Sequence, residues 1–180
     1  MNFIVYDLEA TCWKGRPPSL IQEIIEIGAV KVNGYGEVLG QFNAFVRPIV
    51  NPMLSSFCTE LTGITQVQVN RAARFDRVVE DFLDWMEEDD EDFLLCSWGS
   101  FDKKMLISDC KLHDWEYDWV ENHINVKRQY QTIRNLRNPK GLLRAVEAEG
   151  FEFDGDHHRA IDDAINLAKI FIKLLDEWQY

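Results

Sequence analysis

Short apolar segments recur along the chain, each with the length and residue types of a β-strand. The first runs from Phe3 to Ala10 and the second from Glu23 to Val32. An Asn-Gly-Tyr-Gly turn at 33–36 leads into a third, at about 37–47. These three predict an antiparallel meander. Phe93 to Ser97 predicts a buried parallel strand, and His123 to Val126 predicts a last strand.

Helical spacing of apolar residues marks the rest of the chain. It is clearest in Arg74 to Glu88, where the apolar residues recur on one face. Further helices are expected at Ser55 to Leu61 (stopped by Gly63), Phe101 to Leu112, Leu142 to Glu149 and Ile161 to Trp178. Three strands followed by alternating helices and strands predict an α/β fold, a mixed sheet flanked by helices, in one domain over 1–180.

Composition is that of an ordinary soluble globular protein, with 46% hydrophobic and 28% charged residues. Apolar runs fall short of the roughly 20 residues that span a bilayer, so we expect no membrane association. The first residues have no basic region typical of a secretory signal. Four scattered cysteines fit free thiols in a reducing compartment. A cytoplasmic location is the expectation.

The charge pattern is uneven. A net charge of −12 argues against a protein that coats duplex nucleic acid. The segment Lys127 to Arg144 nevertheless contains six basic residues and no acid, whereas Glu87 to Asp92 is six acids in a row. We expect the acidic run to be a solvated loop that ends a helix. The basic segment is either a phosphate-binding surface or a solvated helix face.

Two acids in the first strand suggest a cation site. Asp7 and Glu9 are two residues apart, so their carboxylates point to the same face, roughly 7 Å apart along the backbone. Unpaired buried charge is costly, and a divalent cation would supply the missing partner. The alternative is a strand end that reaches solvent.

Two acids at helix starts extend this hypothesis. Helical steps from Asp163 reach Leu167, Ile170 and Leu174, so Asp163 faces the core, whereas Asp162 heads a polar face. Asp102 follows the strand 93–97 at the start of a helix, at the strand end where α/β proteins place ligands. Both acids could instead simply match a helix dipole.

Three ordered motifs carry a family resemblance. Asp7-x-Glu9, the stretch Ser97 to Asp102, and His158-x-Ala160-x-x-Asp163 resemble the three exonuclease motifs of the DEDDh superfamily. The runs at 7–12, 61–64 and 98–100 are similar to the branch of the histone-mRNA 3′ exonuclease and the KapD-like bacterial proteins. The resemblance spans nearly the whole chain and implies a ribonuclease-H-like fold.

The resemblance implies two-metal-ion hydrolysis. Two divalent cations, Mg²⁺ or Mn²⁺, would be held by the four acids Asp7, Glu9, Asp102 and Asp163. His158 would be the general base that deprotonates the attacking water, and the H-x-A-x-x-D spacing selects it over His157. Without that spacing, the two histidines would be interpreted as a solvated polar pair.

The resemblance also assigns substrate contacts. The backbone at Ala10 and Thr11 would meet the terminal nucleotide, with Leu61 and Ile64 as an apolar wedge against its base. Core packing is the alternative for Leu61 and Ile64. Either Trp98 or Phe101 could line the nucleotide pocket, and Arg134 and Arg137 are candidates for phosphate contacts.

The expected function is a 3′→5′ exonuclease that releases nucleoside 5′-monophosphates from single-stranded RNA ends. The preference for RNA over DNA rests on the branch resemblance. A DNA exonuclease or proofreading-type subunit is the alternative with the same chemistry, and a small phosphodiesterase acting on dinucleotides would share the site. A regulatory nucleic-acid-binding module of the same fold would be expected to lack an acid or the histidine, and all five residues are present.

Overall fold

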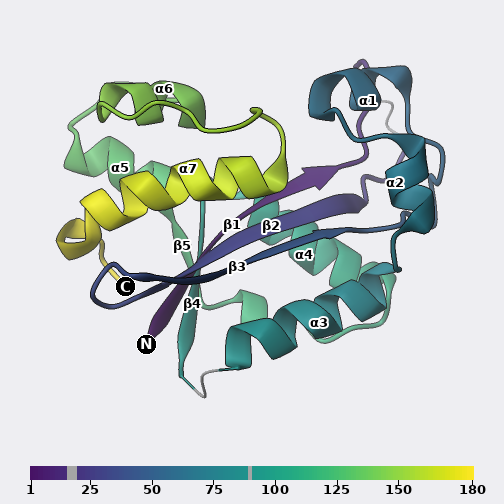
Figure 1. Cartoon of the computed structure of the whole chain (residues 1–180), viewed down its shortest axis with the longest axis horizontal. Coiled ribbons are helices and arrows are strands. Elements are labelled where there is room, and N and C mark those ends of the chain that lie inside the picture. Colours follow the sequence, from purple (N-terminus) through teal and green to yellow (C-terminus); the bar gives the residue numbers. More distant parts are fainter. Residues whose placement is uncertain (16–19, 89–90) are drawn as a thin grey trace.

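The computed structural model describes residues 1–15, 20–88 and 91–180. At its centre lies a five-stranded mixed sheet of order β3-β2-β1-β4-β5 (Figure 1). The strands are β1 (Asn2–Ala10), β2 (Ile24–Asn33), β3 (Val38–Phe45), β4 (Phe93–Ser97) and β5 (His123–Asn125). β1, β2 and β3 pair antiparallel, whereas β4 runs parallel to β1 and β5 parallel to β4. The predicted meander and the parallel β4 are confirmed.

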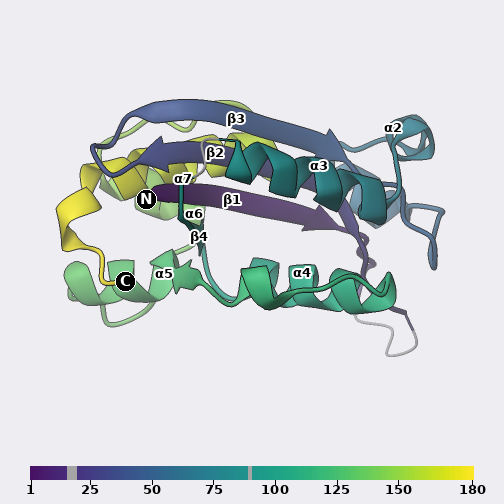
Figure 2. The same ribbon diagram turned by 90° about the horizontal axis from the view of Figure 1, so that it is seen from below.

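Helices cover both faces of this sheet. They are α1 (Ser56–Thr62), α2 (Gln66–Arg71), α3 (Phe75–Glu87), α4 (Phe101–Leu112), α5 (Val126–Ile133), α6 (Leu142–Ala148) and α7 (Ala160–Lys173), with 3₁₀ turns at Asp118–Val120 and Leu175–Glu177. Residues of α5, α6 and α7 pack in one core cluster, and residues of α3 and α4 pack in another. Figure 2 shows α3 in front of β1 and β2 and α7 behind them. The predicted α/β fold is confirmed.

β1 is the central strand, and its alternation explains where the acids lie. Phe3 and Val5 belong to the cluster under α7, whereas Ile4 and Tyr6 belong to the cluster under α3 and α4. Side chains alternate between the faces of a strand. Asp7 and Glu9 therefore continue the α7 face of the sheet toward its carboxyl end.

The structure differs from the predicted helices at α2, α5 and α7. α2 and α5 were not predicted, and the strand expected to reach Val126 ends at Asn125, so that Val126 begins α5. The last helix stops at Lys173 instead of continuing to Trp178. The chain turns back there, so that the indole N–H of Trp178 donates to the Phe171 carbonyl oxygen at 2.9 Å.

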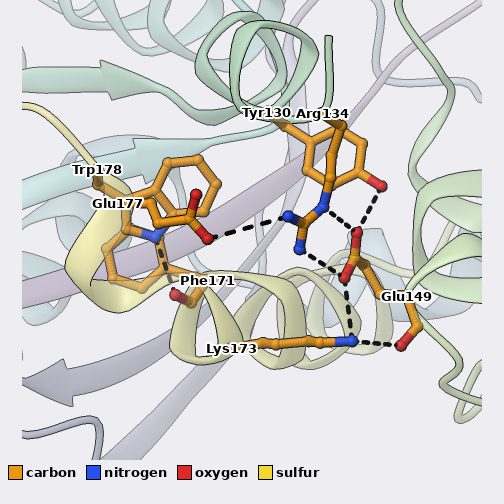
Figure 3. A network of polar contacts seen from close by, with 7 residues as sticks. All are labelled: Tyr130, Arg134, Glu149, Phe171, Lys173, Glu177 and Trp178. Atoms are coloured by element: carbon orange, nitrogen blue, oxygen red, sulfur yellow. Dashed lines mark hydrogen bonds and ion pairs between the residues drawn. The ribbon is translucent and has the colours of Figure 1, made fainter. Parts of the chain in front are cut away.

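A network of ion pairs joins α5, α6 and α7 (Figure 3). The Glu149 carboxylate, just beyond α6, accepts hydrogen bonds from Arg134 Nε at 2.8 Å and from the Tyr130 hydroxyl at 2.9 Å. Lys173 Nζ lies 3.0 Å from the same carboxylate. Arg134 Nη1 is also 3.9 Å from Glu177. The network fixes the helices that cover one face of the sheet.

The predicted acidic loop lies only partly within the described structure. α3 ends at Glu87, one residue before the predicted end at Glu88, and positions 89–90 of the acidic run lie outside the described residues. Among the helices that the structure describes, none has the length and apolar character needed to cross a bilayer.

Candidate active site

Three of the predicted acids converge at the carboxyl end of β1. Ligand oxygens of Asp7, Glu9 and Asp163 all lie within 4.8 Å of one another. Glu9 is 8% exposed and Asp163 3% exposed, and Asp7 is half-buried. The helical stripe that separated Asp163 from Asp162 therefore predicted the inward-facing acid correctly.

The close approach of α7 to the sheet brings these acids together. Gly28 is the β2 partner of Asp7. A Cβ atom at Gly28 would lie 2.2 Å from the Ala160 carbonyl carbon and 2.2 Å from the Ile161 nitrogen. Only a glycine leaves room for the first turn of α7 at this point. Asp163, in that turn, thereby comes into reach of β1.

Asp102 lies at the first turn of α4, just beyond β4, and is 4% exposed. It does not belong to the 4.8 Å group of Asp7, Glu9 and Asp163. Burial raises its pKa to about 6, against hydrogen bonds from its own backbone, the Ser97 hydroxyl and the Leu8 backbone. After burial, the charge of Asp102 is the next cause of the raised pKa of Asp7. Asp102 therefore faces the cluster from the β4 side.

The acids of the site are buried with too little positive charge to balance them. Burial is the main cause that raises the pKa of Glu9 to about 9, and the charges of Asp163 and Glu26 add to it. Burial also raises the pKa of Asp163, although its hydrogen bond with His157 opposes this. Clustered carboxylate oxygens of this kind are the ligands that Mg²⁺ and Mn²⁺ prefer. The residues present thus fit hard divalent cations.

Both histidines of the 157–158 pair contact Asp163. The backbone N–H of His158 donates to Asp163 Oδ2 at 3.0 Å, and His158 has a left-handed φ of 71°. His157 Nδ1 lies 2.8 Å from Asp163 Oδ1, and the two imidazole rings stack with centroids 4.0 Å apart. Burial, followed by the charge of His157, lowers the pKa of His158. The predicted general base thus lies at the cluster, together with a neighbour that the motif left aside.

Two of the residues predicted to contact substrate have exposed side chains, and two others are buried. Ala10 ends β1 and Thr11 follows it, and both are buried, at 6% and 2% exposed. The Thr11 backbone N–H donates to the Glu23 carbonyl oxygen at 2.8 Å, and Cys58 Sγ of α1 lies 3.7 Å from the Ala10 carbonyl oxygen. This contact holds α1 beside the end of β1 (Figure 1). Leu61 on α1 is 38% exposed and Phe101 on α4 is 47% exposed. Leu61 and Phe101 are therefore open to a ligand.

Two other candidates pack internally. Ile64 is fully buried with Ile25 and Val69, so the expectation of a base contact from Ile64 does not fit. Core packing, the alternative, describes it. The indole N–H of Trp98 donates to the Lys140 carbonyl oxygen at 3.2 Å. Trp98 anchors the loop after α5, so of the two aromatic candidates Phe101 is the one left to face a nucleotide.

Of the two candidates for phosphate contacts, one is bound to other side chains of the protein and the other is exposed. Arg134 is engaged by Glu149 and Glu177 (Figure 3). A guanidinium already bound to two carboxylates is a poor phosphate ligand, so Arg134 does not fit the expectation. Arg137 is exposed in the loop that follows. Trp98, which precedes α4, binds that loop at Lys140 and so keeps it near the start of α4. Arg137 therefore stays a candidate for phosphate contacts.

Three residues at the site were missed by sequence reasoning. His157 was set aside for lack of motif spacing, and Glu26 and Arg159 were not singled out. Glu26 and Arg159 form an ion pair with an Nη2–Oε1 distance of 2.9 Å. One sequence signal could have revealed Glu26, since an acid in the strand expected to pair with Asp7 and Glu9 is as unusual as they are.

Comparison with known proteins agrees with this geometry. Residues 4–171 match the RNase_T family model, described as an exonuclease. The human protein 3'-5' exoribonuclease 1 is 35% identical over an alignment of 181 residues, gaps included, that covers 96% of this chain and 52% of that protein. The chain thus spans about half the length of the curated relative that it matches.

Two solved structures are closely similar. One is the nuclease domain of 3'hExo, a DEDDh family member bound to rAMP, with a TM-score of 0.92 and 35% identity over 97% of this chain and 92% of that chain. The other shows 3'-end recognition of a histone mRNA stem-loop by a 3'-exonuclease, with a TM-score of 0.92 and 34% identity. It covers 97% of this chain and 81% of that one.

Proposed function

This chain belongs to the RNase_T exonuclease family, and we propose that it is a metal-dependent 3′→5′ exonuclease acting on single-stranded RNA ends. The observation that carries the proposal is the convergence of Asp7, Glu9 and Asp163, from two elements distant in sequence, within a chain that matches the family over residues 4–171. The released products would be nucleoside 5′-monophosphates.

Four acids would hold two divalent cations, Mg²⁺ or Mn²⁺. Asp7, Glu9 and Asp163 offer oxygens close enough to share an ion, and Asp102 completes the set from the β4 side. When bound, the cations offset the charge of these acids and of the phosphate, and supply Lewis-acid activation. An acidic protein can bind a phosphodiester at this site for that reason.

His158 would act as the general base. Its backbone is fixed to Asp163, so its imidazole stays beside the carboxylates where the scissile phosphate would bind. A neutral imidazole there can take the proton of the attacking water. The water attacks the last phosphorus atom, the bond to the 3′ oxygen of the preceding nucleotide breaks, and that oxygen leaves with a proton.

Substrate binding would use the open rim. Leu61 and Phe101 offer exposed apolar surface for the terminal base, and the backbone at Ala10 and Thr11, which is buried, would border the terminal nucleotide. Bases stack on such surfaces without sequence readout. The preference for RNA follows from the similar proteins, one bound to rAMP and another recognising a histone mRNA stem-loop.

End-labelled single-stranded RNA and DNA, each with Mg²⁺, Mn²⁺ or EDTA, test this proposal. We expect stepwise loss of nucleotides from a free 3′ hydroxyl, faster on RNA, and none in EDTA. Asp7→Asn should abolish the activity, whereas Asp84→Asn, an exposed acid on α3, should retain it. Undiminished activity in Asp7→Asn or in EDTA would contradict the mechanism, and faster loss from DNA would contradict the substrate.

A further inference from the structure

Glu26 is a fully buried acid beside the proposed metal ligands. It is 0% exposed and pairs with Glu9 across the β1–β2 ladder. Directly paired residues of antiparallel strands point to the same face, so Glu26 shares its face with Asp7 and Glu9. Its charge adds to that of Asp163 in opposing the ionisation of Glu9. An acid that works against its neighbours in this way needs another role.

The partners of Glu26 all lie at the start of α7. Arg159 Nε donates to its Oε2 at 3.1 Å and Arg159 Nη2 to its Oε1 at 2.9 Å, a two-bond pairing. The backbone N–H of Ala160 donates to Oε2 at 3.0 Å. Ala160 is the first residue of α7, and the N-cap residue Arg159 makes no side-chain cap hydrogen bond. Glu26 therefore caps α7 from a neighbouring strand.

The backbone packs tightly at the same place. Gly28, two residues along β2 from Glu26, is the position where a Cβ atom would lie 2.2 Å from the Ala160 and Ile161 backbone. The first turn of α7 thus packs directly against β2, and Glu26 binds it there through hydrogen bonds. A turn held at two points has little freedom to slide along the sheet.

The two proposed active-site residues near the start of α7, His158 and Asp163, both adjoin Arg159, the partner of Glu26. His158 directly precedes Arg159, and Asp163 donates its own backbone N–H to the Arg159 carbonyl oxygen at 2.9 Å. Any movement of Arg159 would therefore move His158 and Asp163 relative to Asp7 and Glu9. A misplacement of about 1 Å can cost two orders of magnitude in rate.

We propose that Glu26 and Arg159 are positioning residues for the exonuclease reaction. Through their ion pair and the bond to Ala160, they hold Asp163 against the β1 acids and His158 over the site. The inference rests on the proposed function for its effect on turnover. Its effect on cation binding can be measured without turnover.

Arg159→Gln is the decisive variant because positioning and simple electrostatics predict opposite signs. Removal of a positive charge beside the acids would by itself tighten Mn²⁺ binding. Loss of positioning would weaken it, by about 10- to 100-fold as for other residues that orient metal ligands. We expect weaker Mn²⁺ binding in calorimetry, and a kcat about 10- to 100-fold lower with little change in the KM for RNA.

Arg159→Lys and a distant ion pair serve as controls. Lysine keeps the charge but cannot make the two-bond pairing, so it should show the same defects and remain informative if Arg159→Gln does not fold. Arg134→Gln breaks a comparable pair with the buried Glu149, away from the site. It should lower stability while leaving Mn²⁺ affinity and kcat at wild-type values.

The outcomes separate this inference from the proposed function. Wild-type or tighter Mn²⁺ binding together with normal kcat in the folded Arg159 variants would overturn the positioning role, while wild-type activity on RNA kept the function intact. A wild-type protein that binds Mn²⁺, loses affinity in both Arg159 variants and cleaves neither RNA nor DNA would overturn the function and leave the positioning of Asp163 supported. Losses in Arg134→Gln equal to those in Arg159→Lys would also overturn the inference.

Discussion

Asp163 is the residue on which the site converges. One carboxylate oxygen contacts His157 Nδ1 and the other accepts from the His158 backbone, while the same carboxylate lies within 4.8 Å of ligand atoms of Asp7 and Glu9. The two histidines therefore differ in what their rings can do. His157 uses Nδ1 on Asp163, and His158 is held by its backbone.

This difference predicts unequal effects of replacing the two histidines. His158→Asn should lower kcat by about 10²- to 10³-fold, because the proposed general base is lost. His157→Asn should stay within about 10-fold of wild type, since asparagine can still reach Asp163 by a hydrogen bond. Initial rates at saturating RNA and Mn²⁺ measure both. Equal losses, or a larger loss for His157→Asn, would mean that the assignment of the base is wrong.

Residue-scale predictions succeeded where the signal was local. Asp163 could be recognised because Leu167 and Ile170, on the same helical stripe, are buried as the pattern required. The contacts of Trp98 with Lys140 and of Arg134 with Glu149 could not be recognised. Their partners are distant along the chain, so no periodic pattern in the sequence reveals these contacts. The Glu26–Arg159 pair, whose members have a sequence separation of 133, is the extreme case.

At the scale of elements, the two ends of α7 have different roles. Its first turn carries Asp163 and packs on β2 at Gly28. Near its last turn, Lys173 joins the network around Glu149 (Figure 3). The network is remote from the proposed chemistry, so it should govern stability and its pH dependence.

Glu149 gives a prediction with a definite sign. Hydrogen bonds from Arg134 chiefly lower its pKa from 4.5 to about 2. The carboxylate therefore contributes its full stabilisation above pH 4.5 and loses it as the pH falls from about 4.5 toward 2. Glu149→Gln should cost about 3 kcal/mol at pH 7, and less at pH 3. Urea unfolding of both proteins at pH 7, 5 and 3 measures the difference in their free energies of unfolding. A difference that stays constant with pH would contradict the role of the charge.

Element boundaries show where pattern reading fails. α2 buries only Val69, and α5 buries only Val126 and Tyr130. So few apolar positions give no helical period, although Thr65 and Gln68 form a capping box that marks the start of α2. α7 was predicted too long because Trp178 continues the apolar spacing. That side chain reaches the core after the chain has turned back on Phe171.

At the scale of the whole molecule, charge is unevenly distributed. The net charge is −12, yet the loop between α5 and α6 carries Arg137 and Lys140 and no acid, whereas the buried acids Glu9, Glu26, Asp102 and Asp163 lie together at the site. Salt dependence of RNA binding should therefore depend on a few residues and not on the average charge.

Arg137→Gln should flatten that dependence. Loss of one phosphate contact reduces the slope of log affinity against log salt by about 0.7 for a single strand. Binding of a labelled single-stranded phosphorothioate RNA, which resists hydrolysis, at a fixed Mn²⁺ concentration and across a series of salt concentrations, gives the slope. Arg77→Gln, on α3, is the matched control and should leave it unchanged. The same slope in Arg137→Gln and wild type would show that Arg137 is merely solvated.

Divalent cations should stabilise the whole fold through the acids. Mn²⁺ at about 100 times its dissociation constant should raise Tm by about 5–10 °C, because it offsets the buried charges of Asp7, Glu9 and Asp163. Glu9→Gln should reduce this increase strongly, whereas Asp84→Asn should preserve it. Thermal unfolding with Mn²⁺ or with NaCl of equal ionic strength measures the effect. An equal rise in Glu9→Gln would place the cation elsewhere.

In the proposed reaction, water activated at the Asp7–Glu9–Asp163 cluster attacks the last phosphodiester of an RNA strand. Digestion of a 3′-hydroxyl RNA in ¹⁸O-labelled water, followed by mass spectrometry of the released nucleotide, follows the oxygen of that water. We expect nucleoside 5′-monophosphate carrying one ¹⁸O atom in its phosphate, formed with Mn²⁺ and absent in Asp7→Asn. Release of a 2′,3′-cyclic phosphate or a 3′-phosphate, or of 5′-monophosphate without the label, would contradict it.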